Sequence, residues 1–510
     1  MNCMLLKWLS MIHCNIISLI CISAMLASCG CSQKNEAEKE VPTPPSTESF
    51  VRMADGNTFE SALLKHNVPF SILLPKSYLS EPERRYPVVY MLHGLGDKPE
   101  SWNDSWLRVE AKIKQLEEAG MGDMIYVFPS GYKTYYCNRL DGGYPYMDMF
   151  ITEFIPFIDQ HYRTVADKGH RAITGYSMGG FGACAMALKH PEMFCSSAPL
   201  SMSFRTDQQY MTEEQSGWNS QWGRIFGGSG QTGEGRLTDY YKQHCPFYQF
   251  TAENKAAVSG VKWFFTCGDD EEQLLVAGDD LHVQMRQAGI EHEYRVNNGA
   301  HTGDYWRNAL AEVLPMFDYY MNGGAQWKPL ADKTESSRLS YDEAFVSPEW
   351  KEGTGTLAIL VHNNLDQASL ESIMAAMDKS DLSKAFVIAP CDISKKPLAD
   401  WISSWEAKYP SAKRICVVIG EDSAPALEMD FERWILIDAA CSSPQPAIAK
   451  GQKVYLACTE DAINYEGMGL LYKTCKFNEA TFEYRVLQTS GDKTDNYVRS
   501  IKSLISFLIY

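Results

Sequence analysis

A serine stands among glycines in the segment RAITGYSMGGFGA, which covers residues 171–183. Ser177 completes a G-x-S-x-G pattern that follows an apolar, strand-like run and precedes a helical one. A tight strand-to-helix turn forces the serine into a strained backbone conformation, and Gly175 and Gly179 relieve the crowding around it. Because such a turn exposes the hydroxyl, the pattern predicts that Ser177 is a catalytic nucleophile.

An acid and a general base follow the serine, in the chain order serine, acid, histidine. His301, in NNGAHTGDYW, comes after the strand-like segment HEYRV and before a helical segment, where a base would reach over the serine. Residues 269–272 are four consecutive acids that follow the strand-like segment VKWFFTC. One carboxylate among them would orient the imidazole, and either aspartate or glutamate can do so.

Two backbone N–H groups are predicted to form an oxyanion hole, which binds the charge of a tetrahedral intermediate. The Met178 N–H begins the helix after the serine, and the Leu95 N–H lies in the turn LHGLG. His93, in the same turn, is interpreted as a residue that shapes the turn by hydrogen bonding. His282 and His292 are interpreted as structural. This chemistry requires no metal and no organic cofactor.

Short apolar segments recur between residues 66 and 321 and are rich in β-forming residues. Because they are apolar on both faces, they predict buried parallel strands rather than half-exposed ones. Helical patterns lie between them, so the sequence predicts an α/β fold with helices on both faces of a mostly parallel sheet. The predicted strands are 86–92, 124–128, 170–175 and 261–267, with helices over 182–190 and 281–289.

Four segments carry a resemblance to a known family: YPVVYMLHGLGDKPESW, GYSMGGFGA, the CG-acidic strand end and GAHTGDYW. They resemble the esterase D and feruloyl-esterase-like branch of the α/β-hydrolases, which includes carbohydrate esterase family 1 and, more distantly, the antigen 85 acyltransferases. The resemblance covers roughly residues 48–322. It implies an α/β-hydrolase fold and a catalytic domain over 49–322. It also implies a serine carboxylic-ester hydrolase that forms an acyl-enzyme on feruloyl or acetyl esters of plant polysaccharide.

The resemblance also suggests which acid completes the triad. In the family the acid usually stands three residues after the strand-end glycine, and counting from Gly268 places Glu271 there. The commoner residue in the family is aspartate, so Asp270 is the alternative. Two other functions stay open: an acyltransferase of the antigen 85 type, and a non-catalytic glycan-binding lipoprotein.

Two aromatic-rich segments interrupt the predicted fold, residues 131–150 and 203–228. Aromatic side chains in loops above a catalytic serine can stack on a sugar or on a hydroxycinnamoyl ring. The alternative is that these side chains pack a lid. The predicted substrate-binding residues are Tyr135, Tyr136, Trp218 and Trp222.

The chain begins with features of an export signal. Lys7 is followed by an apolar run and small residues, which predict a signal peptide over 1–28. LASC resembles the bacterial lipobox, which implies lipidation at Cys29, a membrane anchor and a location in the bacterial cell envelope. Residues 29–48 are polar and contain prolines, so they predict a tether. An ordinary signal peptide or a transmembrane anchor are the alternatives.

Composition narrows the class of protein further. The chain has 510 residues, 45% hydrophobic and 22% charged, which predicts folded globular protein in two domains. A formal net charge of −17 without a basic block argues against a nucleic-acid partner. No Cys/His cluster has zinc spacing, and several cysteines lie in apolar runs where they are expected to be buried.

The segment EYRV occurs twice, at 293–296 and 483–486. After a predicted linker over 323–355, the strand-like segments of the first part recur in the same order but closer together. The second part therefore predicts a smaller copy of the same fold over 356–510.

The second copy lacks the catalytic residues of the first. His362 stands in the place of His93, but the serine pattern has become VIGED, with Gly420 or Asp422 where the serine would be. The segment TSGDKTDNY contains no histidine in the place of His301. The sequence therefore predicts a degenerate, non-catalytic domain.

Overall fold

The protein is described from a computed structural model, which defines residues 53–325, 327, 344–347, 350–378, 385–420, 429, 431, 433–439, 448 and 451–509. All of them belong to one compact unit, Pro45–Tyr510. The predicted signal peptide, Cys29 and the tether lie outside the described residues, as do most of the predicted linker and Asp422. Among the helices in the described ranges, none has both the length and the apolar character needed to cross a membrane.

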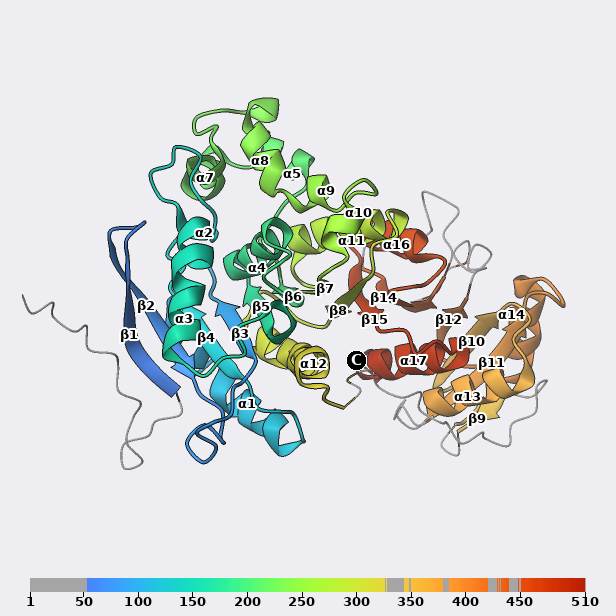
Figure 1. Cartoon of the computed structure of the whole chain (residues 1–510). Helices are drawn as coiled ribbons and strands as arrows, with labels where there is room; N and C mark the ends of the chain where they lie inside the picture. The colour runs from blue at the N-terminus through green and yellow to red at the C-terminus, as the bar shows by residue number, and fades with distance from the viewer. Residues whose placement is uncertain are drawn as a thin grey trace, which may run out of the picture. The chain divides into compact units, whose positions relative to one another are not determined.

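The centre of this unit is one 15-stranded sheet (Figure 1). The strands are β1 (Met53–Ser61), β2 (His66–Leu73), β3 (Val88–Leu92), β4 (Ile125–Pro129), β5 (Arg171–Tyr176), β6 (Ser196–Leu200), β7 (Lys262–Gly268), β8 (His292–Asn297), β9 (Phe345–Val346), β10 (Thr356–His362), β11 (Phe386–Asp392), β12 (Lys413–Ile419), β13 (Arg433–Ile437), β14 (Lys453–Thr459) and β15 (Thr481–Leu487). Their order is β1-β2-β4-β3-β5-β6-β7-β8-β15-β14-β13-β12-β10-β11-β9.

The first half of the sheet has the topology of an α/β-hydrolase. Strands β3 to β8 are parallel to one another, and β2, which lies next to the edge strand β1, is antiparallel to β4. The predicted strands correspond to β3, β4, β5 and β7, and every residue of the first three is buried. The sequence did not predict β6, whose residues SSAPL carry little strand propensity. The predicted α/β-hydrolase fold is confirmed.

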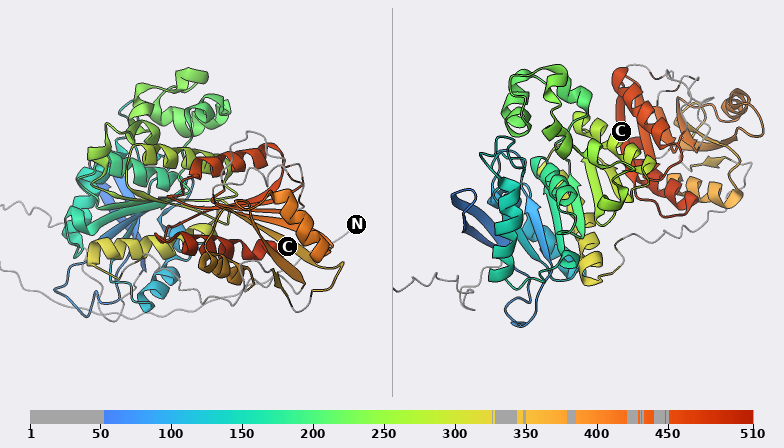
Figure 2. Two further views of the ribbon diagram at one scale, coloured as in Figure 1. Left: turned by 90° about the vertical axis from the view of Figure 1, so that its right-hand side faces the viewer. Right: turned by 45° about the horizontal axis from the view of Figure 1, so that its top comes forward.

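Helices cover both faces of the sheet, as Figure 2 shows. α1 and α12 pack on one face of the first half, and α13 and α17 pack on that face of the second half. On the other face α3, α4, α11, α14 and α16 bury one apolar core that is continuous across both halves. The helices are α1 (Val109–Glu118), α2 (Tyr146–Met149), α3 (Ile155–His161), α4 (Met178–Lys189), α5 (Asp207–Thr212), α6 (Gln215–Gly217), α7 (Arg224–Phe226), α8 (Asp239–His244), α9 (Pro246–Gln249), α10 (Lys255–Val258), α11 (Glu272–Gln287), α12 (Gly303–Asn322), α13 (Gln367–Asp378), α14 (Leu398–Lys408), α16 (Tyr465–Phe477) and α17 (Lys493–Ile509).

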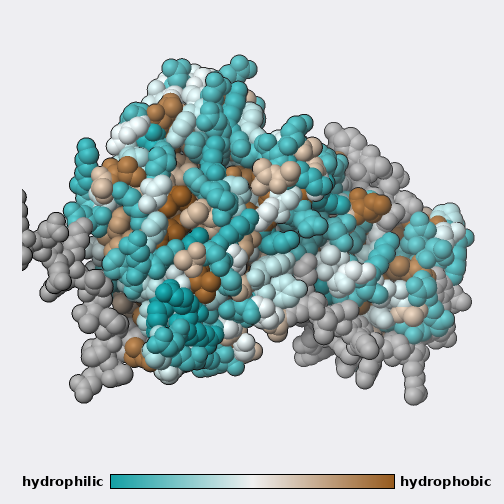
Figure 3. Space-filling view, in the orientation of Figure 1, coloured by the Kyte–Doolittle hydropathy of each residue, from teal (hydrophilic) through white to brown (hydrophobic). Residues whose placement is uncertain are grey.

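Among the described residues, the buried apolar side chains form three clusters: one that is continuous across both halves, and one in each half on the opposite face of the sheet. The face seen in Figure 3 is mostly hydrophilic, with apolar side chains in small, separate groups. Every cysteine in the described ranges is a free thiol, and all of them except Cys195 are buried. The buried thiols act as small apolar side chains, as their sequence context indicated.

The second half repeats the strand order of the first. The order β4-β3-β5-β6-β7-β8 is matched by β11-β10-β12-β13-β14-β15, and all neighbours in both series are parallel. β9 lies antiparallel on β11, as β2 does on β4, although its residues fall in the segment predicted as a linker. The two halves are joined by an antiparallel pair of edge strands, β8 and β15, so they share one sheet.

A carboxyl group is buried where α11 meets the second half. Asp279 is 3% exposed, and its Oδ1 accepts hydrogen bonds from the Tyr294 hydroxyl at 3.0 Å and the Tyr465 hydroxyl at 2.8 Å. Burial raises the pKa of Asp279 to about 7, because the hydroxyl groups offset only part of the desolvation of the charged form. Asp279 is therefore largely protonated in the folded protein below neutral pH.

This raised pKa predicts a loss of stability as the pH rises. The folded protein holds the Asp279 proton more tightly than the unfolded chain does, so the contribution is full below about pH 4 and is lost as pH rises through the folded value. Between about pH 5.5 and about pH 8.5 we expect a decrease of about 2 kcal/mol from this group. Denaturant unfolding of wild type and Asp279→Asn at both pH values measures this decrease in the free energy of unfolding. An equal decrease in both proteins would show that it does not come from Asp279.

Candidate active site

Ser177 occupies the turn between β5 and α4, as the sequence predicted. Its φ is 57° and its ψ is −118°, a conformation that residues other than glycine rarely adopt. The Ser177 N–H donates to the Leu200 carbonyl at 3.0 Å, and the Ser177 carbonyl accepts from the Ser203 N–H at 2.9 Å. Bonds to the segment around the end of β6 therefore hold the strained turn in place.

The glycines around the serine are required by close backbone contacts. A Cβ atom on Gly179 would lie 2.0 Å from the Leu92 carbonyl oxygen. A Cβ atom on Gly175 would lie 2.5 Å from the backbone of Gly179 and 2.7 Å from the same Leu92 oxygen. No side chain fits at these distances, so the crowding predicted from the G-x-S-x-G pattern is present.

His301 and Glu271 come from the same edge of the sheet as Ser177. The loops that carry them follow β8 and β7, and the carboxyl ends of these parallel strands lie on the edge where β5 ends. Glu271 Oε2 lies 2.5 Å from His301 Nδ1. The Glu271 side chain is 1% exposed and the His301 side chain is 41% exposed. A buried carboxylate thus holds one ring nitrogen, which is the arrangement that prepares the other nitrogen to accept a proton.

Glu271 is positioned by Gly268 and by Ser201 and Trp306, two residues that the sequence did not identify. Its Oε1 accepts hydrogen bonds from Ser201 Oγ at 2.6 Å and from the Gly268 N–H at 2.8 Å. Ser201 Oγ in turn accepts from the Trp306 indole N–H at 2.8 Å. Ser201 directly follows β6 and has a φ of 44°. Its only sequence signal was the end of a strand that itself was not predicted.

The other acids of the 269–272 run have different surroundings. Asp269 is buried and forms an ion pair with Arg485 of the second half. The Asp270 side chain is exposed. Glu272 is exposed and lies 3.0 Å from Lys476. The acid that the structure brings to His301 is therefore Glu271, and Asp270 points into solvent.

The turn after β3 is held in place by the side chain of His93. His93 is fully buried; its Nδ1 donates to the Gly94 carbonyl at 2.8 Å, and its Nε2 accepts from the Gly131 N–H at 2.9 Å. Burial lowers the pKa of His93 to about 4, so the ring is neutral and its predicted structural role is confirmed. Leu95 lies in this turn, and Met178 is the first residue of α4, where helix N–H groups lack intrahelical partners.

The four predicted substrate-binding aromatics are inside the protein, which corrects that interpretation. Tyr135, Tyr136 and Trp218 are 0% exposed and Trp222 is 1% exposed. The Tyr135 and Trp222 rings pack at 4.2 Å, and the Tyr136 hydroxyl donates to the His93 carbonyl at 3.0 Å. The Tyr135 hydroxyl donates to Gln221 Oε1 at 2.9 Å, and the Trp218 indole N–H donates to the Gly228 carbonyl at 2.8 Å. Because all four rings are buried, they are not free to stack on a substrate. The lid-packing alternative describes them.

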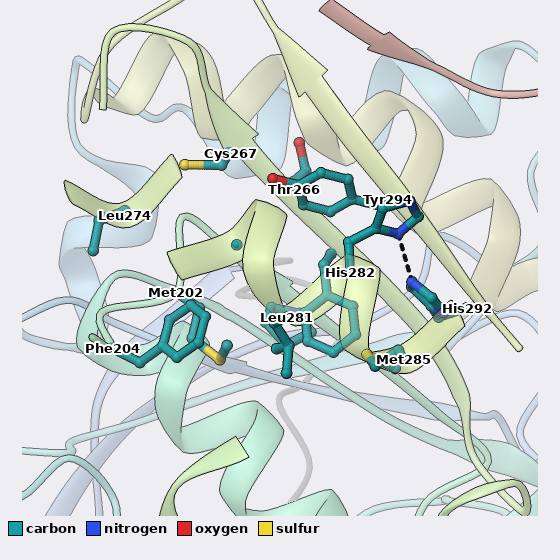
Figure 4. Close-up of a pocket in the computed structure, with 13 residues that line it drawn as sticks. Met202, Phe204, Thr266, Cys267, Leu274, Leu281, His282, Met285, His292 and Tyr294 are labelled. Carbon is teal, nitrogen blue, oxygen red and sulfur yellow. Dashed lines mark hydrogen bonds between the residues drawn. The ribbon is translucent and has the colours of Figure 1, made fainter. Parts of the chain in front are cut away.

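A cavity between β6, β7, β8 and α11 is too small for an ester substrate (Figure 4). Its volume is about 20 Å³, which is room for about one water molecule. His282 Nδ1 and His292 Nε2 lie 2.7 Å apart beside it, and burial lowers the pKa of both rings. Both histidines are therefore structural, as predicted. Within the described ranges, no group of three or more His, Cys, Asp and Glu side chains is arranged to hold a metal ion.

Comparison with known proteins identifies a family to which the first half of the chain is similar. A family model described as "Putative esterase" matches residues 61–317. An esterase of Mycobacterium tuberculosis is 25% identical over 260 residues, which are 48% of this chain and 54% of the relative. The endo-1,4-beta-xylanase/feruloyl esterase of Xylanibacter ruminicola is 25% identical over 258 residues, which are 48% of this chain and 28% of the relative.

A solved structure also matches the first half. A ferulic acid esterase with 29% sequence identity covers 53% of this chain and 99% of its own, with a TM-score of 0.45. This chain spans about half the length of the curated M. tuberculosis relatives.

Proposed function

The chain belongs to this esterase family through residues 61–317, and on that premise we propose that it is a serine carboxylic-ester hydrolase. The observation that carries the proposal is the 2.5 Å contact between Glu271 and His301, on the sheet edge where Ser177 sits in a strained turn. A surface histidine would not need a buried carboxylate held by two further donors. A nucleophile–base–acid triad does need one.

The proposed reaction has two steps. His301 accepts the hydroxyl proton as Ser177 Oγ attacks the ester carbonyl, and the N–H groups of Leu95 and Met178 bind the oxyanion. The intermediate collapses, the ester C–O bond breaks, and the alcohol leaves with the proton from His301. Water then attacks the acyl-enzyme, again giving a proton to His301, and the carboxylic acid is released as that proton returns to Ser177.

We propose that the substrates are feruloyl or acetyl esters of plant polysaccharide, with feruloyl favoured. The relative named endo-1,4-beta-xylanase/feruloyl esterase supports this class. The buried aromatics give it no support, because they do not face a substrate.

A panel of three esters tests the class. We expect wild type to hydrolyse methyl ferulate with a higher kcat/KM than p-nitrophenyl acetate or acetylated xylan. Preference for the acetyl esters would instead indicate a small acyl pocket. Transfer of the acyl group to an added sugar, in place of release, would make the protein an acyltransferase.

We further propose that residues 356–509 are a non-catalytic copy of the first half. The repeated strand order supports this, as do two backbone conformations. Gly420 follows β12 with a φ of 86°, where Ser177 follows β5; Asp438 follows β13 with a φ of 48°, where Ser201 follows β6. If the second half had its own nucleophile, turnover would survive the loss of Ser177.

Finally, we propose that the protein is an exported cell-envelope lipoprotein anchored through Cys29. The supporting features are the apolar segment after Lys7 and the lipobox-like LASC. The mass of the N-terminal peptide from membrane fractions tests this proposal, and an unmodified Cys29 in mature protein would contradict it.

A further inference from the structure

The two EYRV segments meet where the halves join. β8 and β15 run antiparallel, with Val296 opposite Val486. The segments are therefore related by an approximate two-fold rotation, and the arginine of each half bonds to a carboxylate of the other half. The carboxylates that pair with these two arginines differ in one respect: only one of them also bonds to a loop of the candidate active site.

Arg485 reaches from β15 to the first half. Its Nη1 donates to Asp269 Oδ2, and the Tyr484 N–H donates to the same oxygen at 3.2 Å. The side chains of Arg485 and Asp269 are 9% and 3% exposed. A carboxylate this deeply buried is stable as an anion only with a charged partner and several donors, and Arg485 supplies the charge.

Arg295 makes the mirror-image contact from β8. Its Nη1 donates to Glu460 Oε2 at 2.6 Å, and the Tyr294 N–H donates to the same oxygen at 2.8 Å. The side chains of Arg295 and Glu460 are 2% and 9% exposed. Both ion pairs are thus buried and take matching positions relative to the junction, and Arg295 donates in addition from Nε to Glu312 Oε2 at 3.2 Å in its own half.

The pairs differ in what else the carboxylate holds. Asp269 Oδ1 accepts the Gly299 N–H at 2.9 Å, and Gly299 stands two residues before His301. The Gly299 carbonyl also accepts the Asp270 N–H at 3.1 Å, next to Glu271. Asp269 therefore ties the loop of the base to the loop of the acid. The Glu460 carboxylate has the matching bond to the Tyr294 N–H but, among the described residues, no counterpart of the Asp269–Gly299 bond to a loop.

We propose that Arg485 is a positioning residue for the esterase site, which fixes the His301 loop through Asp269 and Gly299. The inference rests on the proposed function for its catalytic consequence. It gives the second half a role in catalysis, although we propose that this half is itself non-catalytic.

The physical reason lies in the charge of Asp269. Burial raises the pKa of Asp269, and the positive charge of Arg485 opposes that rise. Without Arg485 the Asp269 carboxyl group would take up a proton, or water would enter to solvate its charge. Its bond to the Gly299 N–H would then lose the assistance of the negative charge. A loop released in this way lets His301 move from the position in which it can accept the serine proton, and shifts of about 1 Å cost up to about 100-fold in rate.

The test compares Arg485→Gln with wild type in the full chain. We expect kcat to fall about 10- to 100-fold with KM within about 3-fold, because alignment rather than substrate binding is lost. Hydrogen exchange measured by mass spectrometry is expected to be faster over residues 298–302. Arg485→Lys, which keeps the charge, is expected to recover most of the kcat. If Arg485→Gln does not fold, Asp269→Asn makes the same comparison.

Glu460→Gln is the matched control. This substitution breaks the mirror-image ion pair. If the two pairs had only a structural role, Glu460→Gln and Arg485→Gln would lose esterase activity to the same extent. We expect its kcat within about 3-fold of wild type and its 298–302 exchange unchanged. Equal losses in the two variants would overturn the proposal, as would a folded Arg485→Gln with wild-type kcat and exchange. The exchange readout needs no substrate, so a wild type without esterase activity would refute the proposed function while leaving the Arg485 tie measurable.

Discussion

Replacing Ser177 by alanine is expected to reduce the rate of ester hydrolysis by roughly 10⁴- to 10⁶-fold. The activity that remains would come from the oxyanion donors and from substrate binding alone. The turn that holds Ser177 places one hydroxyl at the carboxyl edge of the sheet, and the matching position of the second half is Gly420. Initial rates on methyl ferulate measure the loss. Covalent labelling by a fluorophosphonate probe, located by mass spectrometry, identifies the modified residue.

Ser220→Ala is the control for this experiment, because Ser220 is an exposed serine in one of the insertions. It is expected to keep wild-type rates and wild-type labelling. Turnover that survives in Ser177→Ala would reveal a second nucleophile. Folded wild type that neither turns over an ester nor takes the probe would favour a non-catalytic, glycan-binding lipoprotein.

Glu271→Gln is expected to lower kcat by roughly 10²- to 10⁴-fold while the protein remains folded. The new amide keeps an oxygen for the donors Ser201 and Gly268, so its NH₂ group turns toward His301 Nδ1. The imidazole must then carry its proton on Nε2, and it can no longer accept the proton of Ser177. The fault is the wrong tautomer rather than a lost fold.

Asp270→Asn separates this effect from a general loss of negative charge. Its side chain is exposed, and its backbone bond to Gly299 does not depend on the carboxylate. We expect activity within about 3-fold of wild type. A larger loss in Asp270→Asn than in Glu271→Gln would transfer the role of triad acid to Asp270.

Local patterns in the sequence were sufficient for much of the fold. β3, β4, β5 and β7 are apolar on both faces, which is a property of the segment itself. β6, with the residues SSAPL, was missed because a strand with two serines and a proline is stabilised by its neighbours rather than by its own propensity. β13 was missed as well, and it holds the same place in the second half.

Local patterns in the sequence also predicted part of the candidate active site. Ser177 and His301 are marked by the residues beside them, whereas Glu271 was favoured over its acidic neighbours only through the family resemblance. Ser201 and Trp306 act through contacts between distant parts of the chain, which no local pattern reports. The loop aromatics were misjudged for a related reason: composition marks an insertion as aromatic, but burial depends on how the insertion folds back on itself.

The reciprocal junction between β8 and β15 has a consequence for how the protein behaves on dilution. In an isologous homodimer, residue i of one subunit contacts residue j of the other, and residue j of the first contacts residue i of the second. The contacts across this junction follow the same rule. Here both partners belong to one chain, so the effective concentration of the second copy is fixed by covalent connection. An interface that in a dimer would weaken as subunits separate is thus present at every enzyme concentration. If the second half is the non-catalytic copy that we propose, the catalytic half keeps this neighbour at its sheet edge at any dilution.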